Sequence, residues 1–347
     1  MQKIALVGSF WFASLEESYA RAFLELGWDV VRVELESQSL NKGIAQLPGV
    51  RKLLRPIRVG VVARELEELV RIEKPDIVLV FKGLEVGLEA LTRMKRASDI
   101  PIANFNPDSP WEPRNTSFAL RSALATYDHH FVWSRNLLAR FKAAGARSVS
   151  YLPFGYDPNL HYPVDGPIEP EKCEFDAVFL GTYDPIRDKL LGALSRCNIA
   201  VWGNDWKRAN YVDSGWIKGE ALYGADGVRA MRKGRVALNI LRQQNVGSHN
   251  MRTFEIPATR LPMLTTRSQE QSELFVEGKE MLCYDTAEEL LETLLSLRSN
   301  HGGLRELAQS AYQRVLPHTY TARAATIIST LQALQSNPES LEATSAQ

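Results

Sequence analysis

Short apolar runs alternate with amphipathic stretches along the first half of the chain. Runs of this kind are typical of strands that are buried on both faces of a sheet. Amphipathic patterns at 61–73 and 135–145 predict helices between such strands. The alternation predicts a parallel sheet that helices cover on both faces. The predicted strands cover residues 3–8, 29–35, 76–81, 100–105, 129–134 and 148–153.

The first predicted helix follows directly after the first strand. Ser14 and Glu17 have the spacing of a capping box, in which each side chain accepts a hydrogen bond from the main chain of the other. Gly27 is the residue type that most often follows a helix end. These signals place the helix between Ser14 and Gly27.

A segment rich in proline and glycine, residues 153–172, separates two alternating series. Such a composition is typical of linkers between domains. The second series predicts another set of strands and helices in alternation, and hence another parallel sheet. Its strands are expected at 175–181, 198–203, 236–241 and 261–266, and its helices near 220–232, from Met251, and at 286–298, 302–315 and 321–334.

We therefore expect an α/β fold made of two doubly wound, Rossmann-like domains that face each other across a cleft. The chain of 347 residues also exceeds what one hydrophobic core usually supports. The expected division is 1–155 for the first domain and 156–320 for the second. Residues 336–347 lack apolar spacing, which predicts a flexible tail.

The charge and the cysteines narrow the function classes. Lys plus Arg and Asp plus Glu number 41 each, so no global field favours nucleic acid as a partner. The three cysteines, Cys173, Cys197 and Cys283, form no CxxC pair, and the histidines form no HxxxH or HExxH motif. The sequence therefore excludes a disulfide scaffold, and we expect no metal site.

The N-terminal segment favours a cytoplasmic protein. Its apolar run before Gly8 is shorter than a signal-peptide core, and the sequence has no uninterrupted run of eighteen apolar residues. Residues 51–64 carry five basic groups, interleaved with aliphatic side chains and without an acid. This pattern suits peripheral contact with the inner face of an anionic membrane, and a solvated helix or loop face is the alternative.

Ligands of doubly wound folds bind beyond the carboxyl ends of the strands, so the loops after the strands hold the candidate residues. Gly8 closes the first predicted strand. Together with Ser9 it would leave main-chain N–H groups free for an anion at the start of the helix. A simple turn is the alternative. The absence of a GxGxxG motif gives little support to dinucleotide binding.

The polar loop 104–115 follows another predicted strand. Asp108 is suited to bind a sugar hydroxyl or to act as a base, and Trp111 is suited to stack on a sugar ring. In the alternative interpretation, Asn106 and Asp108 build an Asx turn ahead of Pro110.

A second candidate anion site follows the predicted strand 175–181. Gly181 ends this strand, and Arg187 and Lys189 lie in the first turns of the next predicted helix. Cations at a helix N-terminus are unfavourable for the helix dipole unless an anion lies nearby. A solvated basic face is the alternative.

The segment "NMRTFEIPATRLPMLTT", residues 250–266, combines a helix start with an apolar strand. Arg252 and Glu255 are three residues apart and share one helical face. Phosphates could bind the N–H groups of Thr253 and Phe254, and a ribose diol could bind Glu255. The alternative is an ion pair between Arg252 and Glu255.

Three motifs together resemble the GT-B glycosyltransferases of group 1, and among them the family of the spore-maturation protein CgeB. The segment "YLPFGYDPNLHYP" (151–163) is similar to the connection between their domains. The stretch "FDAVFLGTYDPIRDKLL" is similar to the start of their donor domain, and residues 250–266 to their donor-site helix and strand. The resemblance covers residues 75–320. It implies a hexosyltransferase that uses a nucleoside diphosphate sugar as co-substrate, with no metal and no other cofactor.

The resemblance also implies roles for the candidate residues. The first domain would bind an unknown acceptor, with helix 321–335 packing back on it, and Asp108 would be the catalytic residue of a retaining transfer. The stretch 216–219 would hold the base, although Ser248 replaces an acid that the better-known relatives carry. The donor side would comprise Gly181, Arg187, Trp216, Lys218, Asn250, Arg252, Thr253, Phe254 and Glu255, and the acceptor side Gly8, Ser9 and Trp111.

Two other functions fit the same architecture. A nucleotide-sugar epimerase would act on the donor alone, and a sugar- or nucleotide-binding protein would catalyse no reaction. Release of nucleoside diphosphate only in the presence of an acceptor would indicate transfer, whereas a new nucleotide sugar formed without an acceptor would indicate epimerisation.

Overall fold

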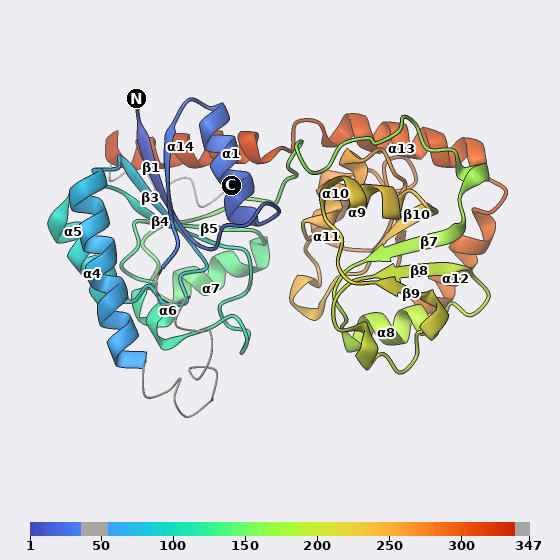
Figure 1. The fold of residues 1–347 in the computed structure, drawn as a ribbon, viewed down its shortest axis with the longest axis horizontal. Coiled ribbons are helices and arrows are strands. Elements are labelled where there is room, and N and C mark those ends of the chain that lie inside the picture. The colour runs from blue at the N-terminus through green and yellow to red at the C-terminus, as the bar shows by residue number, and fades with distance from the viewer. Residues whose placement is uncertain (36–54, 337–347) are drawn as a thin grey trace. The chain divides into compact units, whose positions relative to one another are not determined.

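The computed structural model describes residues 1–35 and 55–336. The chain divides into two compact units. Unit 1 comprises Met1–Pro153 and Tyr320–Gln347, and unit 2 comprises Phe154–Thr319. Each unit contains a six-stranded sheet with flanking helices (Figure 1).

The sheet of unit 1 is parallel throughout, as the alternation of strands and helices predicts. Its strand order is β2-β1-β3-β4-β5-β6, so the second strand of the chain lies at one edge. The strands are β1 (Lys3–Val7), β2 (Asp29–Val33), β3 (Ile77–Phe81), β4 (Ile102–Asn106), β5 (His129–Val132) and β6 (Val149–Tyr151).

Helices cover both faces of this sheet because successive strand residues point to opposite sides. Ala5 and Val7 of β1 share a buried cluster with residues of α4 and α5, which pack against each other. On the other face α1 packs against α14, where the rings of Tyr19 and Tyr320 lie 5.0 Å apart. The helices are α1 (Leu15–Glu25), α4 (Arg55–Glu73), α5 (Leu88–Ala97), α6 (Phe118–Ala123), α7 (Leu138–Ala143) and α14 (Tyr320–Ser336).

The predicted capping box of α1 forms only in part. The Ser14 side chain accepts a hydrogen bond from the main-chain N–H of Glu17 at 3.1 Å. The Glu17 carboxylate instead binds the Arg32 guanidinium, with Nε–Oε2 at 2.8 Å. A charge-assisted contact with β2 therefore replaces the reciprocal half of the box.

Two adjacent histidines of β5, His129 and His130, are buried in unit 1. His129 is 1% exposed, between the hydroxyls of Ser148 and Ser150 at 2.9 and 2.8 Å. Burial, with a smaller effect from neighbouring His130, lowers the pKa of His129 to about 3. The unfolded chain has an ordinary histidine pKa and binds the proton first, so stability is lost as the pH falls below about 6.5.

We expect His129→Gln to reduce this acid sensitivity. Wild-type protein should lose about 2 kcal/mol of unfolding free energy between pH 7 and pH 5 through His129 alone, because each unit of pKa difference corresponds to about 1.4 kcal/mol. Urea denaturation at both pH values measures the loss. An equal loss in wild type and His129→Gln would contradict the assignment.

The sheet of unit 2 is also parallel, with the order β12-β11-β10-β7-β8-β9. The apolar runs predict four of its strands, whereas the two edge strands β9 and β12 are absent from the prediction. Each edge strand has three residues and is too short for a pattern to emerge. The strands are β7 (Phe175–Leu180), β8 (Ile199–Trp202), β9 (Ile217–Gly219), β10 (Gly234–Asn239), β11 (Met263–Thr266) and β12 (Leu282–Tyr284).

The helices of unit 2 complete a second doubly wound fold. The buried cluster on one face of its sheet joins Phe179 and Leu238 to Leu290 and Leu294 of α12. The helices are α8 (Pro185–Gly192), α9 (Gly224–Met231), α10 (Arg252–Ala258), α11 (Gln269–Leu274), α12 (Ala287–Ser296) and α13 (His301–Val315).

The first and last segments of unit 2 run beside each other. Tyr156 and Thr319 form an isolated parallel bridge, and the Tyr156 N–H donates to the His318 carbonyl oxygen at 3.1 Å. A Cβ on Gly155 would lie 2.6 Å from the same oxygen, so only glycine permits this approach.

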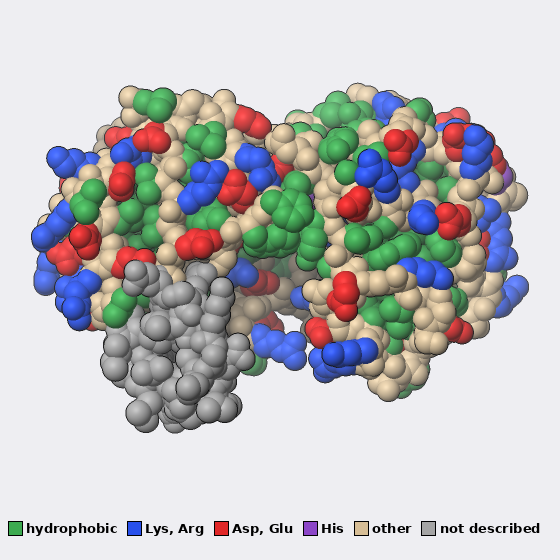
Figure 2. Space-filling model, viewed as in Figure 1, with side chains coloured by type: hydrophobic (Ala, Val, Ile, Leu, Met, Phe, Trp, Pro, Cys, Tyr) green, Lys and Arg blue, Asp and Glu red, His purple; other side chains and the backbone are tan. Residues whose placement is uncertain are grey.

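The basic stretch 51–64 lies partly outside the described residues, as does most of the tail 336–347. Within the described residues, no helix is both long and apolar enough to span a membrane. Figure 2 shows basic and acidic side chains interspersed over the visible surface of both units, in keeping with the balanced composition.

Candidate functional site

Three adjacent strands of unit 1 bring candidate residues together at the carboxyl ends of the strands. Gly8 follows β1, Lys82 follows β3 and Asp108 follows β4, and these strands are neighbours in the sheet. The Lys82 ammonium lies 3.8 Å from Asp108 Oδ2. Lys82 has φ 58°, a left-handed conformation that is uncommon for a residue with a side chain.

A carboxylate that the sequence prediction missed lies near these carboxyl ends. Glu16, in the first turn of α1, is 8% exposed, and its Cγ lies 2.6 Å from the position that a Cβ on Gly8 would take. Burial raises the pKa of Glu16, although hydrogen bonds from the main-chain N–H groups of Glu16 and Ser9 act in the opposite direction. The Gly8 N–H donates to Val33 at 3.1 Å.

This arrangement corrects the interpretation of Gly8 and Ser9 as holding free N–H groups for an external anion. The Gly8 N–H belongs to the main-chain hydrogen bonds beside β2, and the Ser9 N–H points to the Glu16 carboxylate. The anion at the helix start is therefore a side chain of the protein itself. A side chain at residue 8 would displace the Glu16 side chain, which packs closely against Gly8.

Trp111, expected to stack on a sugar, makes contacts within unit 1. Its ring lies edge-on to Phe141 at 5.0 Å, and the Arg140 guanidinium lies 4.5 Å from its centroid. These contacts fix the indole against α7. A role in acceptor binding stays a prediction.

The main-chain N–H groups at the N-terminus of α10 in unit 2 donate hydrogen bonds to main-chain carbonyl oxygens of the same turn. The N–H of Thr253 donates to Asn250 O at 3.2 Å, and the N–H of Phe254 donates to Met251 O at 3.0 Å. Both donors thus have partners within the chain, and the phosphate role of these two N–H groups stays a prediction. Helical turn geometry already begins at Met251, which uses the donors internally.

Arg252 and Glu255 form the ion pair that was the alternative interpretation of their spacing. Arg252 Nη1 lies 2.6 Å from Glu255 Oε2, and His161 Nε2 lies 3.7 Å from Glu255 Oε1. Burial lowers the pKa of His161 and outweighs the opposite effect of the Glu255 charge, so its imidazole is neutral at pH 7. Glu255 itself is 6% exposed and thus sits between one cation and one neutral ring.

Arg187 is a buried cation at the carboxyl ends of β7 and β10. Its guanidinium donates to Ile240 O from Nε at 3.2 Å and from Nη2 at 2.9 Å, and to Thr182 O from Nη1 at 3.0 Å. Burial and then nearby Arg242 lower its pKa to about 10, so it stays protonated at pH 7. Among the described residues, none of its hydrogen bonds reaches a carboxylate.

Gly181 packs close to this arginine. A Cβ at Gly181 would lie 2.7 Å from the Phe179 ring and 3.4 Å from Arg187 Nη1. Glycine here therefore makes room for the aromatic ring and the guanidinium, and the Gly181 carbonyl accepts a hydrogen bond from the Trp206 indole at 2.8 Å.

Two residues predicted to hold the base, Trp216 and Lys218, lie in and just before β9 of unit 2. Trp216 packs against the buried cluster of the unit. The Lys218 ammonium lies 5.5 Å from the ring of Phe175, which begins β7, whereas Gly181 follows the other end of that strand. The register of β9 with β8 places its residues 217–219 level with the carboxyl ends of β8 and β7, so a role of this stretch in binding the base stays a prediction.

Buried amides and hydroxyls connect β10 to α10 and α11. Asn250 Nδ2 donates to Asn239 Oδ1 at 2.8 Å, and Thr253 Oγ1 donates to Gln271 Oε1 at 2.8 Å. Thr265 of β11 also reaches Gln271, at 3.1 Å. Because Thr253 is fully buried in this network, it positions α10 and does not face solvent.

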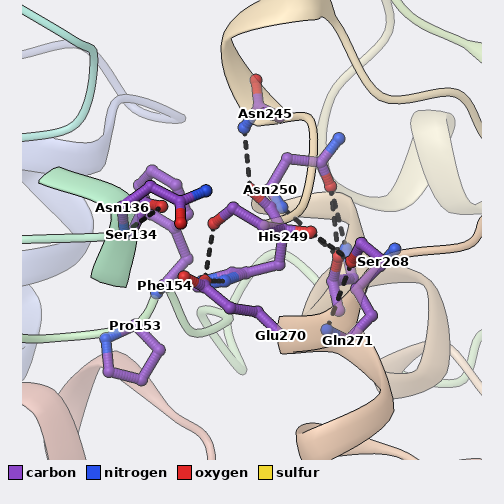
Figure 3. Close-up of polar contacts among 12 residues, drawn as sticks. Ser134, Asn136, Pro153, Phe154, Asn245, His249, Asn250, Ser268, Glu270 and Gln271 are labelled. Atoms are coloured by element: carbon purple, nitrogen blue, oxygen red, sulfur yellow. Dashed lines mark hydrogen bonds and ion pairs between the residues drawn. The ribbon is translucent and has the colours of Figure 1, made fainter.

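Glu270 of α11 faces His249 (Figure 3) and is also the carboxylate partner of Ser248. The Ser248 hydroxyl donates to Glu270 Oε2 at 2.6 Å, and His249 Nδ1 lies 2.9 Å from the same oxygen. On the other side of the ring, His249 Nε2 accepts the N–H of Phe154 at 3.2 Å, which assigns the proton to Nδ1. The sequence prediction missed Glu270 because it lies 22 positions from Ser248.

Within the described part of the chain, no group of three or more His, Cys, Asp or Glu side chains is arranged to hold a metal ion. Whether the reaction is independent of metal stays a prediction from the resemblance.

Residues 186–329 match the family described as glycosyl transferase-like. This stretch includes Arg187, the whole of α10 and part of α14. No curated protein matches the sequence at a significant level.

Solved structures of similar fold cover almost the whole chain. Sucrose-phosphate synthase from Thermosynechococcus elongatus has a TM-score of 0.68 and 12% identity over 97% of this chain and 100% of its own. Anabaena HepE, solved in complex with UDP-glucose, has a TM-score of 0.63 and 14% identity over 96% and 100%. A UDP-N-acetylglucosamine 2-epimerase from Listeria monocytogenes, described as putative, has a TM-score of 0.53 and 13% identity over 98% of both chains.

Proposed function

We propose that this chain, a GT-B protein whose residues 186–329 belong to the glycosyl transferase-like family, transfers a sugar from a nucleoside diphosphate sugar to an acceptor hydroxyl. The observation that carries the proposal is the buried Arg187. It is protonated, lies beyond two strand ends, and makes its hydrogen bonds to carbonyl oxygens. Burying a cation without a carboxylate partner costs free energy unless a bound anion neutralises its charge.

The surroundings of Arg187 favour a diphosphate as that anion. The positive charges of Arg242 and Arg252 both lower the pKa of Arg187, so the three guanidinium groups share one region of unit 2. Such a region stabilises charge that develops on a leaving diphosphate. Arg252 would exchange part of its ion pair with Glu255 for a phosphate oxygen, which leaves the Glu255 carboxylate to accept hydrogen bonds from the ribose diol.

Nucleoside diphosphates test the donor site directly. A ligand at 100 times its dissociation constant stabilises a protein by roughly 2.7 kcal/mol. We expect UDP, GDP or dTDP to raise the melting temperature in a thermal shift assay. UDP-glucose is the first donor to try, since a similar structure contains it. Three nucleotides without effect would count against the proposal.

Glu255→Ala should lower the affinity of the protein for the nucleoside diphosphate that it binds. The expected loss is about 1 to 3 kcal/mol, the usual cost of removing hydrogen bonds to a charged group. Isothermal calorimetry measures it, with the exposed Glu292→Ala on α12 as a control of equal charge change. Unchanged affinity in folded Glu255→Ala would remove Glu255 from the ribose site.

Epimerisation is the second candidate function, and the fold of the Listeria epimerase favours it. The two reactions differ in their products. Transfer releases nucleoside diphosphate and requires an acceptor, whereas epimerisation converts one nucleotide sugar to another.

Retention of anomeric configuration and independence of metal stay predictions from the resemblance. Product analysis with and without EDTA tests them.

A further inference from the structure

His161 lies in a tight turn near the start of unit 2. The Asp157 carbonyl oxygen accepts the N–H of Leu160 at 3.0 Å and the N–H of His161 at 2.9 Å. The Asp157 side chain is buried, and its Oδ1 accepts the N–H of Asn159 at 2.9 Å. These hydrogen bonds fix the main chain of the turn, so the His161 side chain projects from a rigid support.

The His161 imidazole faces the Glu255 carboxylate of α10, which belongs to the same unit. Its Nε2 atom lies 3.7 Å from Glu255 Oε1. Its Nδ1 atom is buried and has no hydrogen-bond partner among the described residues. A neutral imidazole carries one N–H group. That N–H is best placed on Nε2, where the carboxylate can accept it.

The other oxygen of Glu255 already has a close partner. Arg252 Nη1 lies 2.6 Å from Glu255 Oε2, whereas the distance to His161 is slightly longer than a hydrogen bond. Contacts of this kind are often long before a ligand binds and shorten in the complex. A shift of Arg252 toward a phosphate oxygen, as proposed above, would let the carboxylate turn toward His161.

A neutral donor suits this position better than a second cation. Burial lowers the pKa of His161, so the ring is neutral at pH 7. A neutral N–H orients a carboxylate and leaves its negative charge in place. Hydrogen bonds from hydroxyl groups to an ionised acceptor are stronger than those to a neutral one. Glu255 would therefore stay a strong acceptor for the ribose while its orientation is fixed.

We propose that His161 is a positioning residue that holds Glu255 for the ribose, a role that rests on the donor site proposed above. A carboxylate accepts hydrogen bonds from both ribose hydroxyls only in one orientation. Fixing that orientation before binding increases affinity, because less conformational freedom is lost in the complex. His161 would thereby set a preference for ribonucleotides over 2′-deoxyribonucleotides.

Calorimetry with UDP and dUDP, or with GDP and dGDP, measures this preference as a ratio of affinities. Each pair differs only in the 2′-hydroxyl. We expect wild-type protein to bind the ribonucleotide about 10-fold to 100-fold more tightly, since the deoxynucleotide lacks one hydrogen bond to a charged group. His161→Phe keeps a ring and removes the N–H. It should reduce the ratio to below about 3-fold, because Glu255 is no longer held in place.

Two matched variants serve as controls. His161→Gln places an amide N–H near the position of Nε2 and should restore most of the ratio. Tyr162→Phe removes a hydroxyl from the next residue, which is exposed, and should leave the ratio unchanged. His161→Leu also lacks the N–H and provides the same test if His161→Phe fails to fold.

A double-mutant cycle separates positioning from a structural role. Glu255→Ala should abolish the ratio by itself. Adding His161→Phe should then change the ratio no further, because His161 acts through Glu255. A His161 that only stabilises the fold would lower the affinity for both nucleotides by the same factor. The ratio would then keep its wild-type value in His161→Phe, which would overturn the positioning role.

Failure of the proposed function and failure of the His161 role give different results. A wild-type protein that binds no nucleoside diphosphate and no nucleotide sugar would overturn the donor site itself. Equal affinity of wild-type protein for UDP and dUDP, or binding of dTDP alone, would overturn the His161 role and leave the donor site intact. A ratio that is lost in Glu255→Ala but kept in His161→Phe would remove His161 and retain Glu255.

Discussion

Asp188→Ala is expected to lower the unfolding free energy of unit 2 by about 3 to 5 kcal/mol. The Asp188 carboxylate on α8 is 1% exposed. It accepts the main-chain N–H groups of Asn210, Tyr211 and Val212 at 2.8, 3.1 and 3.0 Å. Alanine would leave these donors without an acceptor, in a place from which water is largely excluded.

Urea denaturation followed by tryptophan fluorescence measures this loss, since Trp206 is buried in the same unit. Asp226→Ala on α9 is the matched control, because Asp226 is 78% exposed in its pair with Arg229. It should change stability by less than about 1 kcal/mol. Similar losses in both variants would show that the three N–H bonds contribute little.

Arg187→Met is expected to weaken nucleoside diphosphate binding by about 100-fold and to leave unit 2 at least as stable as wild type. Removing a cation that binds phosphate costs about 1.5 to 3 kcal/mol of affinity. A buried cation also pays a desolvation penalty, so an apolar residue of similar length is often neutral or stabilising. The two effects should therefore have opposite signs.

Calorimetry with UDP, GDP and dTDP, and urea denaturation without nucleotide, measure the two effects separately. Arg229→Met removes the same charge from an exposed position of unit 2 and should change neither. Weaker binding that accompanies a large loss of stability would indicate that Arg187 holds the carbonyl groups of Thr182 and Ile240 in place and has no direct role at the anion.

Apolar runs were sufficient to predict the two parallel sheets. The central strand β3 is buried at every position, so its sequence, IVLVF, is apolar throughout and stands out from the loops. The edge strands β9 and β12 have three residues each, and one residue of β9 is a lysine. Their pairing depends on the neighbouring strand, which no local pattern reveals.

The candidate site was harder to predict because its partners are distant in sequence. The spacing of Arg252 and Glu255 predicted their common face, but His161 reaches Glu255 from a segment some ninety positions earlier. Glu16 follows the serine cap of α1 by two residues and has the appearance of an ordinary first-turn acid. Only the folded loop shows that it packs on Gly8 and lies near Lys82 and Asp108.

Unit 2 is inserted between the two segments of unit 1, and the bridge between Tyr156 and Thr319 holds its first and last residues together. Because the two ends of unit 2 lie close together, another domain could replace it without distorting unit 1, since insertions are best tolerated where the ends of a domain are adjacent. Chimeras joined after Pro153 and before Tyr320 could therefore carry the corresponding segment of another GT-B protein. Such chimeras would test the prediction that unit 2 determines the choice of donor.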